Sequence, residues 1–188
     1  MAASTAPSFS PPRHAFSRED VAFLVRSGLL GEDGVELIEG DLIQKMPRNE
    51  PHVFCTRRIA RTLEALFGFE HVRAQESIAL SARSEPEPDV AVTARTDRDY
   101  LSLGTPPASD IRLVVEVSDT TLDYDLGINA PLYAAAGIPE CWIVDVNARE
   151  LHRHTKPTAS GYQSVLRLPD TASVTVSGTS LAVADLLP

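Results

Sequence analysis

The feature that most constrains the fold is a glutamate inside the most apolar segment of the chain. Residues 111–117 are aliphatic apart from Arg112 and Glu116. A short aliphatic run of this kind is typical of a central strand that is covered on both faces. A carboxylate within such a strand costs several kcal/mol unless it is paired or bound to a metal. Glu116 is therefore expected to have a cationic partner.

A second carboxylate lies at the start of another apolar strand. Asp89 follows Pro88 and precedes Val90-Ala91-Val92, and 27 positions separate it from Glu116. That separation allows a strand, a loop and a neighbouring strand, so the two acids can lie side by side. Converging carboxylates repel one another unless a cation lies between them. Mg²⁺ takes oxygen ligands from one or two carboxylates together with water and phosphate, an arrangement suited to phosphodiester hydrolysis.

The competing interpretation of Glu116 is a structural ion pair. Arg112 and Arg73 are the candidate partners, because buried acids are also perturbed by ion pairs that have no catalytic role. The sequence therefore leaves open a metal site, occupied by Mg²⁺ or Mn²⁺, and an arginine bridge.

Periodicity along the rest of the chain predicts an α/β fold, a mixed central sheet flanked by helices. Helices are expected from the Ser17 N-cap to about Gly28, from Pro51 onward, and over 125–136. Gly40 marks the turn of a hairpin over 35–44. The other expected segments are strands at 72–80, 89–92, 111–117, 141–146, 151–154 and 162–168, a polar loop at 96–110, and a short helix or strand at 181–187.

Length and composition indicate one domain without a membrane span. The 188 residues suit a single domain over 13–188, preceded by an Ala/Ser/Pro-rich flexible arm over 1–12. No apolar run approaches the length of a membrane span, and no secretory signal is apparent, so a cytoplasmic location is expected. Cys55 and Cys141 fit neither a disulfide framework nor a zinc pattern and are expected in the core.

The net charge of −9 and the isoelectric point near 5.0 are unusual for a protein that binds nucleic acid. Non-specific DNA binding normally depends on basic surface. Clustered carboxylates raise the negative charge, however, and a bound divalent ion would invert the local field. The charge therefore excludes a broad basic DNA track but not a metal-dependent nuclease.

The motifs around the two acids resemble known nucleases. Pro88-Asp89 and Glu116-Val117-Ser118 are similar to the PD…(D/E)-x-K signature without its lysine. Longer segments between about residues 13 and 162 resemble the bacterial Uma-type restriction endonuclease family, and they are 35–40, 86–89, 114–127, 131–134 and 137–145. The resemblance implies a restriction-endonuclease-like core and Mg²⁺-dependent cleavage of DNA.

The same resemblance implies roles for individual residues. Asp89 and Glu116 fall on the two metal carboxylates, and the carbonyl of Val117 falls where a third ligand is expected. Further positions of the family site are matched by Glu39, His52 and Gln75. Each of these three also has a simpler interpretation, as a hairpin acid, a helix-start residue and a partner for buried backbone.

The lysine expected from the family is replaced in this chain. The aligned position, on the helix after the Glu-x-Ser segment, is Asn129, which can donate a hydrogen bond but carries no charge. Lys45 and Lys156 are the only lysines, and neither falls in a segment that the sequence places at the site. The hypotheses that remain are a Mg²⁺-dependent DNA endonuclease, which could act as a homodimer, a catalytically impaired adaptor that binds nucleic acid or protein, and a metal-free structural domain.

Several other polar and aromatic residues have structural interpretations. Asp123 and Asp125 are expected to begin and cap the helix that follows them. Tyr133 and Trp142 are expected in or near the core. A solvated helix face is expected for the arginines at 57, 58 and 61, which could otherwise contact phosphate.

Overall fold

The computed structural model describes residues 13–31 and 34–188, so the predicted arm over 1–12 lies outside the described residues. Its centre is a six-stranded sheet with the order β3-β4-β5-β6-β7-β8. The strands are β3 (Val72–Ala74), β4 (Val90–Thr93), β5 (Ile111–Ser118), β6 (Glu140–Asp145), β7 (Glu150–Thr158) and β8 (Gly161–Pro169). Only β5 and β6 pair in parallel within this sheet. The prediction of a mixed central sheet flanked by helices is confirmed.

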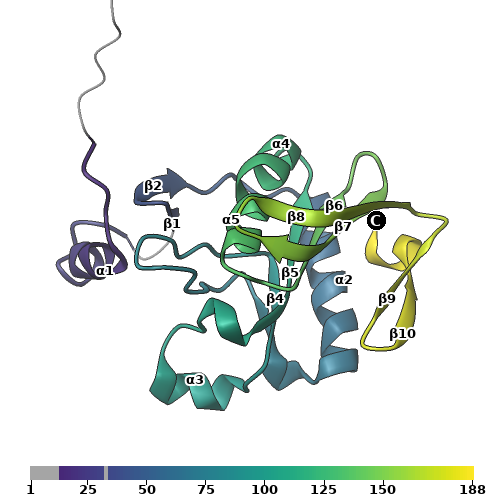
Figure 1. Cartoon of the computed structure of the whole chain (residues 1–188), viewed down its shortest axis with the longest axis horizontal. Coiled ribbons are helices and arrows are strands. Elements are labelled where there is room, and N and C mark those ends of the chain that lie inside the picture. The colour runs from purple at the N-terminus through teal and green to yellow at the C-terminus, as the bar shows by residue number, and fades with distance from the viewer. Residues whose placement is uncertain (1–12, 32–33) are drawn as a thin grey trace, which may run out of the picture.

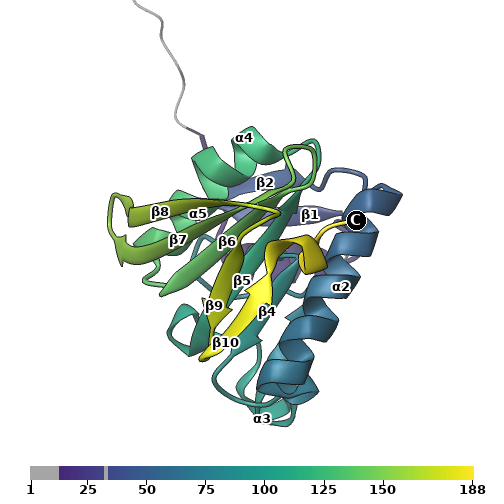
Figure 2. The same ribbon diagram turned by 90° about the vertical axis from the view of Figure 1, so that its right-hand side faces the viewer.

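Helices cover the two faces of the sheet (Figures 1 and 2). Helix α2 (Glu50–Phe67) begins at its N-cap Asn49, whose side chain accepts from the amide of His52. Its apolar stripe of Cys55, Ile59 and Leu63 is fully buried against β3, β4 and β5. Helix α5 (Ala130–Ala135) packs on the opposite face. The predicted helix from Pro51 is confirmed, and Cys55 lies in the core as expected.

Strand β5 alternates between these two faces. Leu113, Val115 and Val117 belong to the core on the α2 side, and Val114 belongs to the core on the α5 side. Because successive side chains of a strand point to opposite faces, Glu116 lies on the α5 side. The carboxylate that the sequence placed in an apolar strand is therefore buried between the sheet and a helix.

A smaller unit of helix α1 (Arg18–Arg26) and the hairpin β1 (Val35–Ile38) and β2 (Asp41–Gln44) lies beside the sheet (Figure 1). Ser17 and Asp20 form a capping box that starts α1, as the sequence predicts. The hairpin turn has φ 51° at Glu39 and 92° at Gly40, the left-handed conformation of tight hairpins. Backbone hydrogen bonds fix the hairpin to residues 83–85.

The helix predicted over 125–136 is present but contains a wider turn. Helix α4 (Leu122–Tyr124) continues into a π-helical turn over Asp125–Asn129 and then into α5. The amide of Ala130 donates to the carbonyl of Asp125, five residues earlier. Pro131 has no N–H, so it removes one bond of a regular helix at this place. Such turns occur frequently at functional sites.

Two sequence expectations about secondary structure are corrected. Strand β3 ends at Ala74 rather than near residue 80, because Gln75 has φ 58° and turns the chain out of the sheet. The predicted loop over 96–110 contains helix α3 (Asp97–Leu103), started by a capping box at Thr96. The short helix or strand expected at 181–187 is confirmed as the end of a second hairpin and a 3₁₀ helix, namely β9 (Ser173–Val176), β10 (Thr179–Ala182) and η4 (Val183–Leu186).

Among the described helices, none has both the length and the apolar character that a membrane crossing requires.

The packing of α2 on the sheet gives a direct stability test. Ile59→Ala should lower the free energy of unfolding by about 2–5 kcal/mol, because Ile59 is fully buried and the truncation leaves a cavity. Leu101→Ala, at a side chain that is 87% exposed, should change it by no more than about 0.5 kcal/mol. Urea denaturation measures both, and equal losses would contradict the assignment of the core.

Candidate functional site

The pairing of β4 with β5 sets Asp89 opposite Glu116. Val90 is the partner of Val115 in this antiparallel ladder, so the residues immediately outside that pair face one another. The amide of Asp89 donates to Oε2 of Glu116 at 3.3 Å, and the amide of Val117 donates to Oδ2 of Asp89 at 2.9 Å. The structure therefore brings together the two acids that the sequence selected, with Val117 beside them.

Asp89 is oriented by residues from two other elements. His52, in the first turn of α2, places Nε2 at 3.0 Å from Oδ2 of Asp89. Gln75, just after β3, donates from Nε2 to Oδ1 of Asp89 at 3.2 Å. Gln75 also accepts from the guanidinium of Arg48. Both predicted neighbours, His52 and Gln75, thus contact the carboxylate directly.

Glu116 is bound by donors from helix α5 and the π-helical turn. The hydroxyl of Tyr133 donates to Oε1 at 2.5 Å, and Nδ2 of Asn129 donates to the same oxygen at 3.3 Å. The second hydrogen of that amide reaches Oδ1 of Asp125 at 2.9 Å. Tyr133 is buried as predicted, but its hydroxyl also belongs to the site.

Asp125 is a buried member of this acidic group rather than a helix cap. Its Oδ2 accepts hydrogen bonds at 2.7 Å from the hydroxyls of Ser118 and Thr121. Burial raises the pKa of Asp125 above its ordinary value, while these hydrogen bonds act in the opposite direction. Asp125 begins the π-helical turn as expected, but its carboxylate does not cap the helix.

The ionised form of Glu116 is strongly disfavoured by its surroundings. Burial, followed by the negative charges of Asp125 and Asp89, raises its pKa well above the ordinary range. The arginine bridge considered from the sequence is absent. Arg73 pairs instead with Glu76 and Asp97. Arg112 is exposed, and no lysine, arginine or histidine of the described residues forms an ion pair with Glu116.

The arrangement fits a hard divalent cation. Asp89 and Glu116 supply carboxylate oxygens from adjacent strands, which are the ligands that Mg²⁺ prefers. Within residues 13–31 and 34–188, the buried Oδ1 of Asn129 has no hydrogen-bond partner, although it lies in a cluster of acids. The raised pKa values of Glu116 and Asp125, together with this unsatisfied oxygen, favour binding of a cation.

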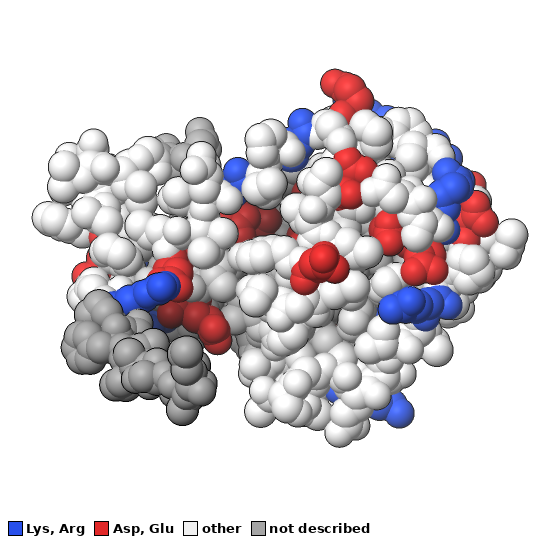
Figure 3. All heavy atoms as spheres, turned by 90° about the horizontal axis from the view of Figure 1, so that it is seen from above, with Lys and Arg blue, Asp and Glu red and all other residues white. Residues whose placement is uncertain are grey.

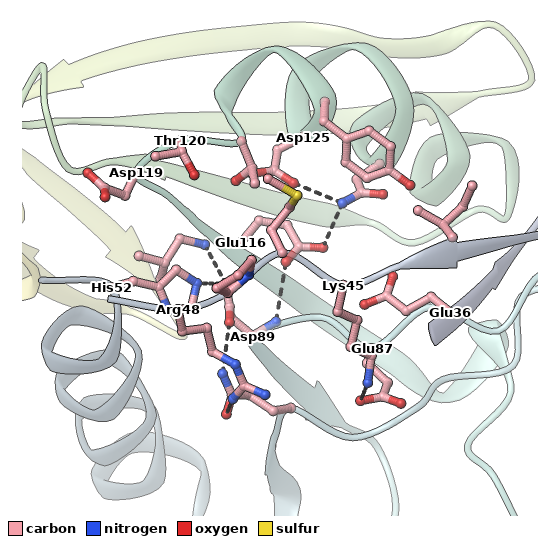
Figure 4. A pocket seen from close by; sticks show the side chains of 18 of the residues that line it. Glu36, Lys45, Arg48, His52, Glu87, Asp89, Glu116, Asp119, Thr120 and Asp125 are labelled. Carbon is pink, nitrogen blue, oxygen red and sulfur yellow. Dashed lines mark hydrogen bonds and ion pairs between the residues drawn. The ribbon is translucent and has the colours of Figure 1, made fainter. Parts of the chain in front are cut away.

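The two acids lie in a pocket of about 440 Å³ formed by the hairpin, the start of α2 and the segment after β5. Figure 4 shows Asp89 and Glu116 converging at its centre. Seven carboxylates line the pocket, against two permanent cations, Lys45 and Arg48. The acids are Glu36, Glu87, Asp89, Glu116, Asp119, Asp123 and Asp125. Acidic side chains are also visible in the notch on the face shown in Figure 3.

Glu39 is not part of this pocket. It is exposed on the hairpin turn, whereas Glu36, three residues earlier on β1, lines the pocket. Burial raises the pKa of Glu36 to about 7, with the charge of Lys45 opposing and that of Glu87 adding to the effect. Of these two hairpin acids, the structure places Glu36, and not the predicted Glu39, in the pocket. The rule that identified Glu116, an acid between apolar neighbours in a strand, also fits Val35-Glu36-Leu37.

Lys45 is the second residue that sequence reasoning missed. It follows β2 directly and lines the pocket, where its ammonium pairs with the carboxylate of Glu87. No local pattern indicates this position, because it depends on how the hairpin docks onto residues 83–85.

Two other groups of polar residues lie outside this pocket. Arg57, Arg58 and Arg61 line a separate groove along α2 and do not reach the two acids. A possible acidic metal site is formed by Asp145, Glu150 and His152, whose ligand atoms lie within 4.8 Å of one another. There Oδ1 of Asp145 already accepts two backbone amides of the β6–β7 turn, and His152 contacts Glu150 at 2.6 Å.

The mixed six-stranded sheet with its flanking helices places the protein in the α/β class, with a nuclease-like fold. A solved structure titled "Crystal structure of a putative nuclease belonging to DUF820", from Anabaena variabilis ATCC 29413, aligns with a TM-score of 0.63. The alignment covers 87% of this chain and 96% of the other, at 17% sequence identity, and therefore supports the fold alone.

The family follows from the sequence match. Residues 30–184 match the model of Uma2, described as "Putative restriction endonuclease", and the chain belongs to this family. The comparison with curated proteins gives no match. The resemblance seen in the sequence is confirmed at the level of family and fold.

The raised pKa of Glu36 gives a prediction about stability and pH. Its folded-state pKa of about 7 exceeds the ordinary value of 4.5, so the stabilising neutral form is lost as the pH rises towards and past 7. In a metal-free buffer with chelator, Glu36→Gln should therefore raise the melting temperature at pH 8 and change it little at pH 5. A difference between variant and wild type that is independent of pH would contradict the assignment.

Proposed function

We propose that this protein is a divalent-cation-dependent endonuclease that hydrolyses phosphodiester bonds of DNA, with Mg²⁺ as the cation and Mn²⁺ as a substitute. The observation that carries the proposal is the convergence of Asp89 and Glu116 from two adjacent strands inside an acidic pocket. Membership of a family described as restriction endonucleases supports the same reaction class.

The residues of the site have distinct roles in this proposal. Asp89, Glu116 and the carbonyl of Val117 would hold the cation, which when bound activates a water molecule and neutralises charge on the phosphate. His52 and Gln75 fix the orientation of Asp89. Tyr133 and Asn129 fix the orientation of Glu116. Such restraint keeps ligand oxygens in place without reorganisation during the reaction.

The negative charge of the pocket attracts a cation and repels DNA, so the cation should bind first. With seven carboxylates against two permanent cations, a DNA phosphate would be repelled from the metal-free pocket. A bound divalent cation reduces that repulsion and creates a direct ligand position for a phosphate oxygen. We therefore expect productive DNA binding to depend on metal, despite the net charge of −9.

An impaired adaptor is the second candidate function, and Asn129 is the observation that favours it. Both hydrogens of its amide are already used by Glu116 and Asp125, so it offers neither charge nor a free donor to a phosphate. An adaptor would bind DNA or a protein without cleaving DNA.

A homodimer is expected if the enzyme cuts both strands of a duplex. Two cuts on antiparallel strands need two sites related by a twofold axis, which an isologous dimer supplies. Size-exclusion chromatography with light scattering measures whether the full chain forms one.

Cleavage of supercoiled plasmid tests the proposed function. The wild-type protein should nick plasmid in Mg²⁺ or Mn²⁺ but not in chelator, and Asp89→Asn should reduce nicking to background because a metal ligand is lost. Glu39→Gln is the matched control, since Glu39 is an exposed acid outside the pocket. Its activity should equal that of the wild type. DNA binding without metal-dependent nicking would favour the adaptor instead.

Metal binding can be measured without DNA. Titration calorimetry with Mn²⁺ should show binding at millimolar or lower concentration by the wild type and by Glu39→Gln, and loss of that binding in Asp89→Asn and Glu116→Gln. If all four proteins bind equally, the cation occupies another site. If none binds, the metal-free structural domain is the better interpretation.

A further inference from the structure

The proposed reaction needs a positively charged group that the segment after β5 does not provide. During hydrolysis of a phosphodiester, negative charge on the phosphoryl oxygens must be stabilised by donors or cations already in place. Asn129 cannot do this, because its two N–H groups point to Glu116 and Asp125. A positive charge beside that of the proposed divalent cation would therefore have to come from another element.

Lys45 is placed to fill this role. Its backbone amide donates to the carbonyl of Gly34 at 2.9 Å, so the end of the hairpin holds its position. Its side chain is only 20% exposed and lies in the pocket wall. Figure 4 shows Lys45 with Glu36 and Glu87 on one side of the pocket, and Asp89 and Glu116 at its centre.

The partner of Lys45 ties it to the proposed metal ligand. Glu87 and Asp89 are separated by one residue, Pro88, and both line the pocket. Residues before a proline favour extended backbone, in which side chains two positions apart point to the same side. The Glu87 and Asp89 side chains are therefore expected to point to the same side of the segment. The ion pair with Glu87 holds the Lys45 ammonium on that side.

Arg48, the other permanent cation of the pocket, is less suited to the task. It is exposed, and its guanidinium donates to the side chain of Gln75. An ammonium has three donor hydrogens, and the described contacts of Lys45 occupy one of them with Glu87. Lys45 can thus keep its anchor and still donate to a phosphoryl oxygen.

We propose that Lys45 is a catalytic residue of this site, whose ammonium contacts a phosphoryl oxygen of the bound DNA and stabilises the charge that develops there. This inference rests on the proposed nuclease function. In the step, the oxygen of a water molecule forms a bond to phosphorus while the bond from phosphorus to the leaving oxygen breaks. The water gives up one proton to solvent, the leaving oxygen takes one from solvent, and Lys45 keeps its own.

The chain contains a matched control for this proposal. Lys156 is the only other lysine and is exposed on β7, outside the pocket. Lys45→Cys should lower kcat for plasmid nicking by about 10²–10³-fold, the cost of removing one donor that acts on the developing charge. Lys156→Cys should leave kcat unchanged. Mn²⁺ affinity measured by calorimetry should stay within about threefold of the wild type in both variants, because Lys45 is not a metal ligand.

Chemical rescue separates loss of charge from loss of folding. Alkylation of Lys45→Cys with 2-bromoethylamine restores an ammonium at nearly the original length and should recover at least a tenth of the lost kcat. The native thiols should not react, since Cys55 and Cys141 are fully buried and burial raises their pKa values. Treated wild type and treated Lys156→Cys should be unchanged.

The outcomes distinguish this inference from the function on which it rests. A wild type that nicks plasmid together with a fully active Lys45→Cys variant would overturn the role of Lys45 and leave the nuclease intact. An inactive Lys45→Cys variant that binds Mn²⁺ normally but is not rescued would also overturn it. A wild type without any metal-dependent nicking would overturn both proposals.

Discussion

The register between β4 and β5 is the constraint on which the site depends. It sets the backbone amide of Asp89 against the carboxylate of Glu116, and the amide of Val117 against the carboxylate of Asp89. Shifting this register by one residue would turn every side chain of β5 to the other face of the sheet. Glu116 would then enter the apolar core under α2 and Val117 would replace it. The aliphatic residues of β5 therefore determine where the acids meet.

Burial of Glu116 has an electrostatic cost that the rest of the pocket does not remove. Tyr133 and Asn129 donate to one of its oxygens, but Asp89 and Asp125 add negative charge from two sides. Protonation of Glu116 at low pH would relieve this cost, and so would the proposed divalent cation at neutral pH. In the proposed mechanism, the cation held by Asp89 and Glu116 and the ammonium of Lys45 would together supply the positive charge.

Much of the fold could be predicted because the relevant signals are local. The aliphatic runs of β4, β5 and β6, the apolar stripe of α2 and the turn at Gly40 each identify their element without knowledge of the others. Helix α3 was missed because only one of its residues, Tyr100, is buried, so its main signal is the capping box at Thr96. Strand β3 was predicted too long because the positive φ of Gln75 ends it.

The site was only partly predictable because some of the residues that line the pocket come from the hairpin, whose position depends on tertiary contacts. Asp89 directly precedes β4 and Glu116 lies on the paired strand β5, a neighbourhood that the spacing of the apolar runs suggests. Glu36 and Lys45 come from a hairpin whose position depends on backbone hydrogen bonds to residues 83–85. Those bonds have no side-chain signature. The prediction from sequence therefore named Glu39, on the turn, as the hairpin acid of the site, whereas Glu36, on the strand, lines the pocket.

The most direct test of the central claim is a crystal structure of the full chain with Mn²⁺, using anomalous scattering to locate the ion. The account predicts an anomalous peak bound by the carboxylates of both Asp89 and Glu116. A well-ordered pocket without such a peak, or manganese found only among Asp145, Glu150 and His152, would contradict it.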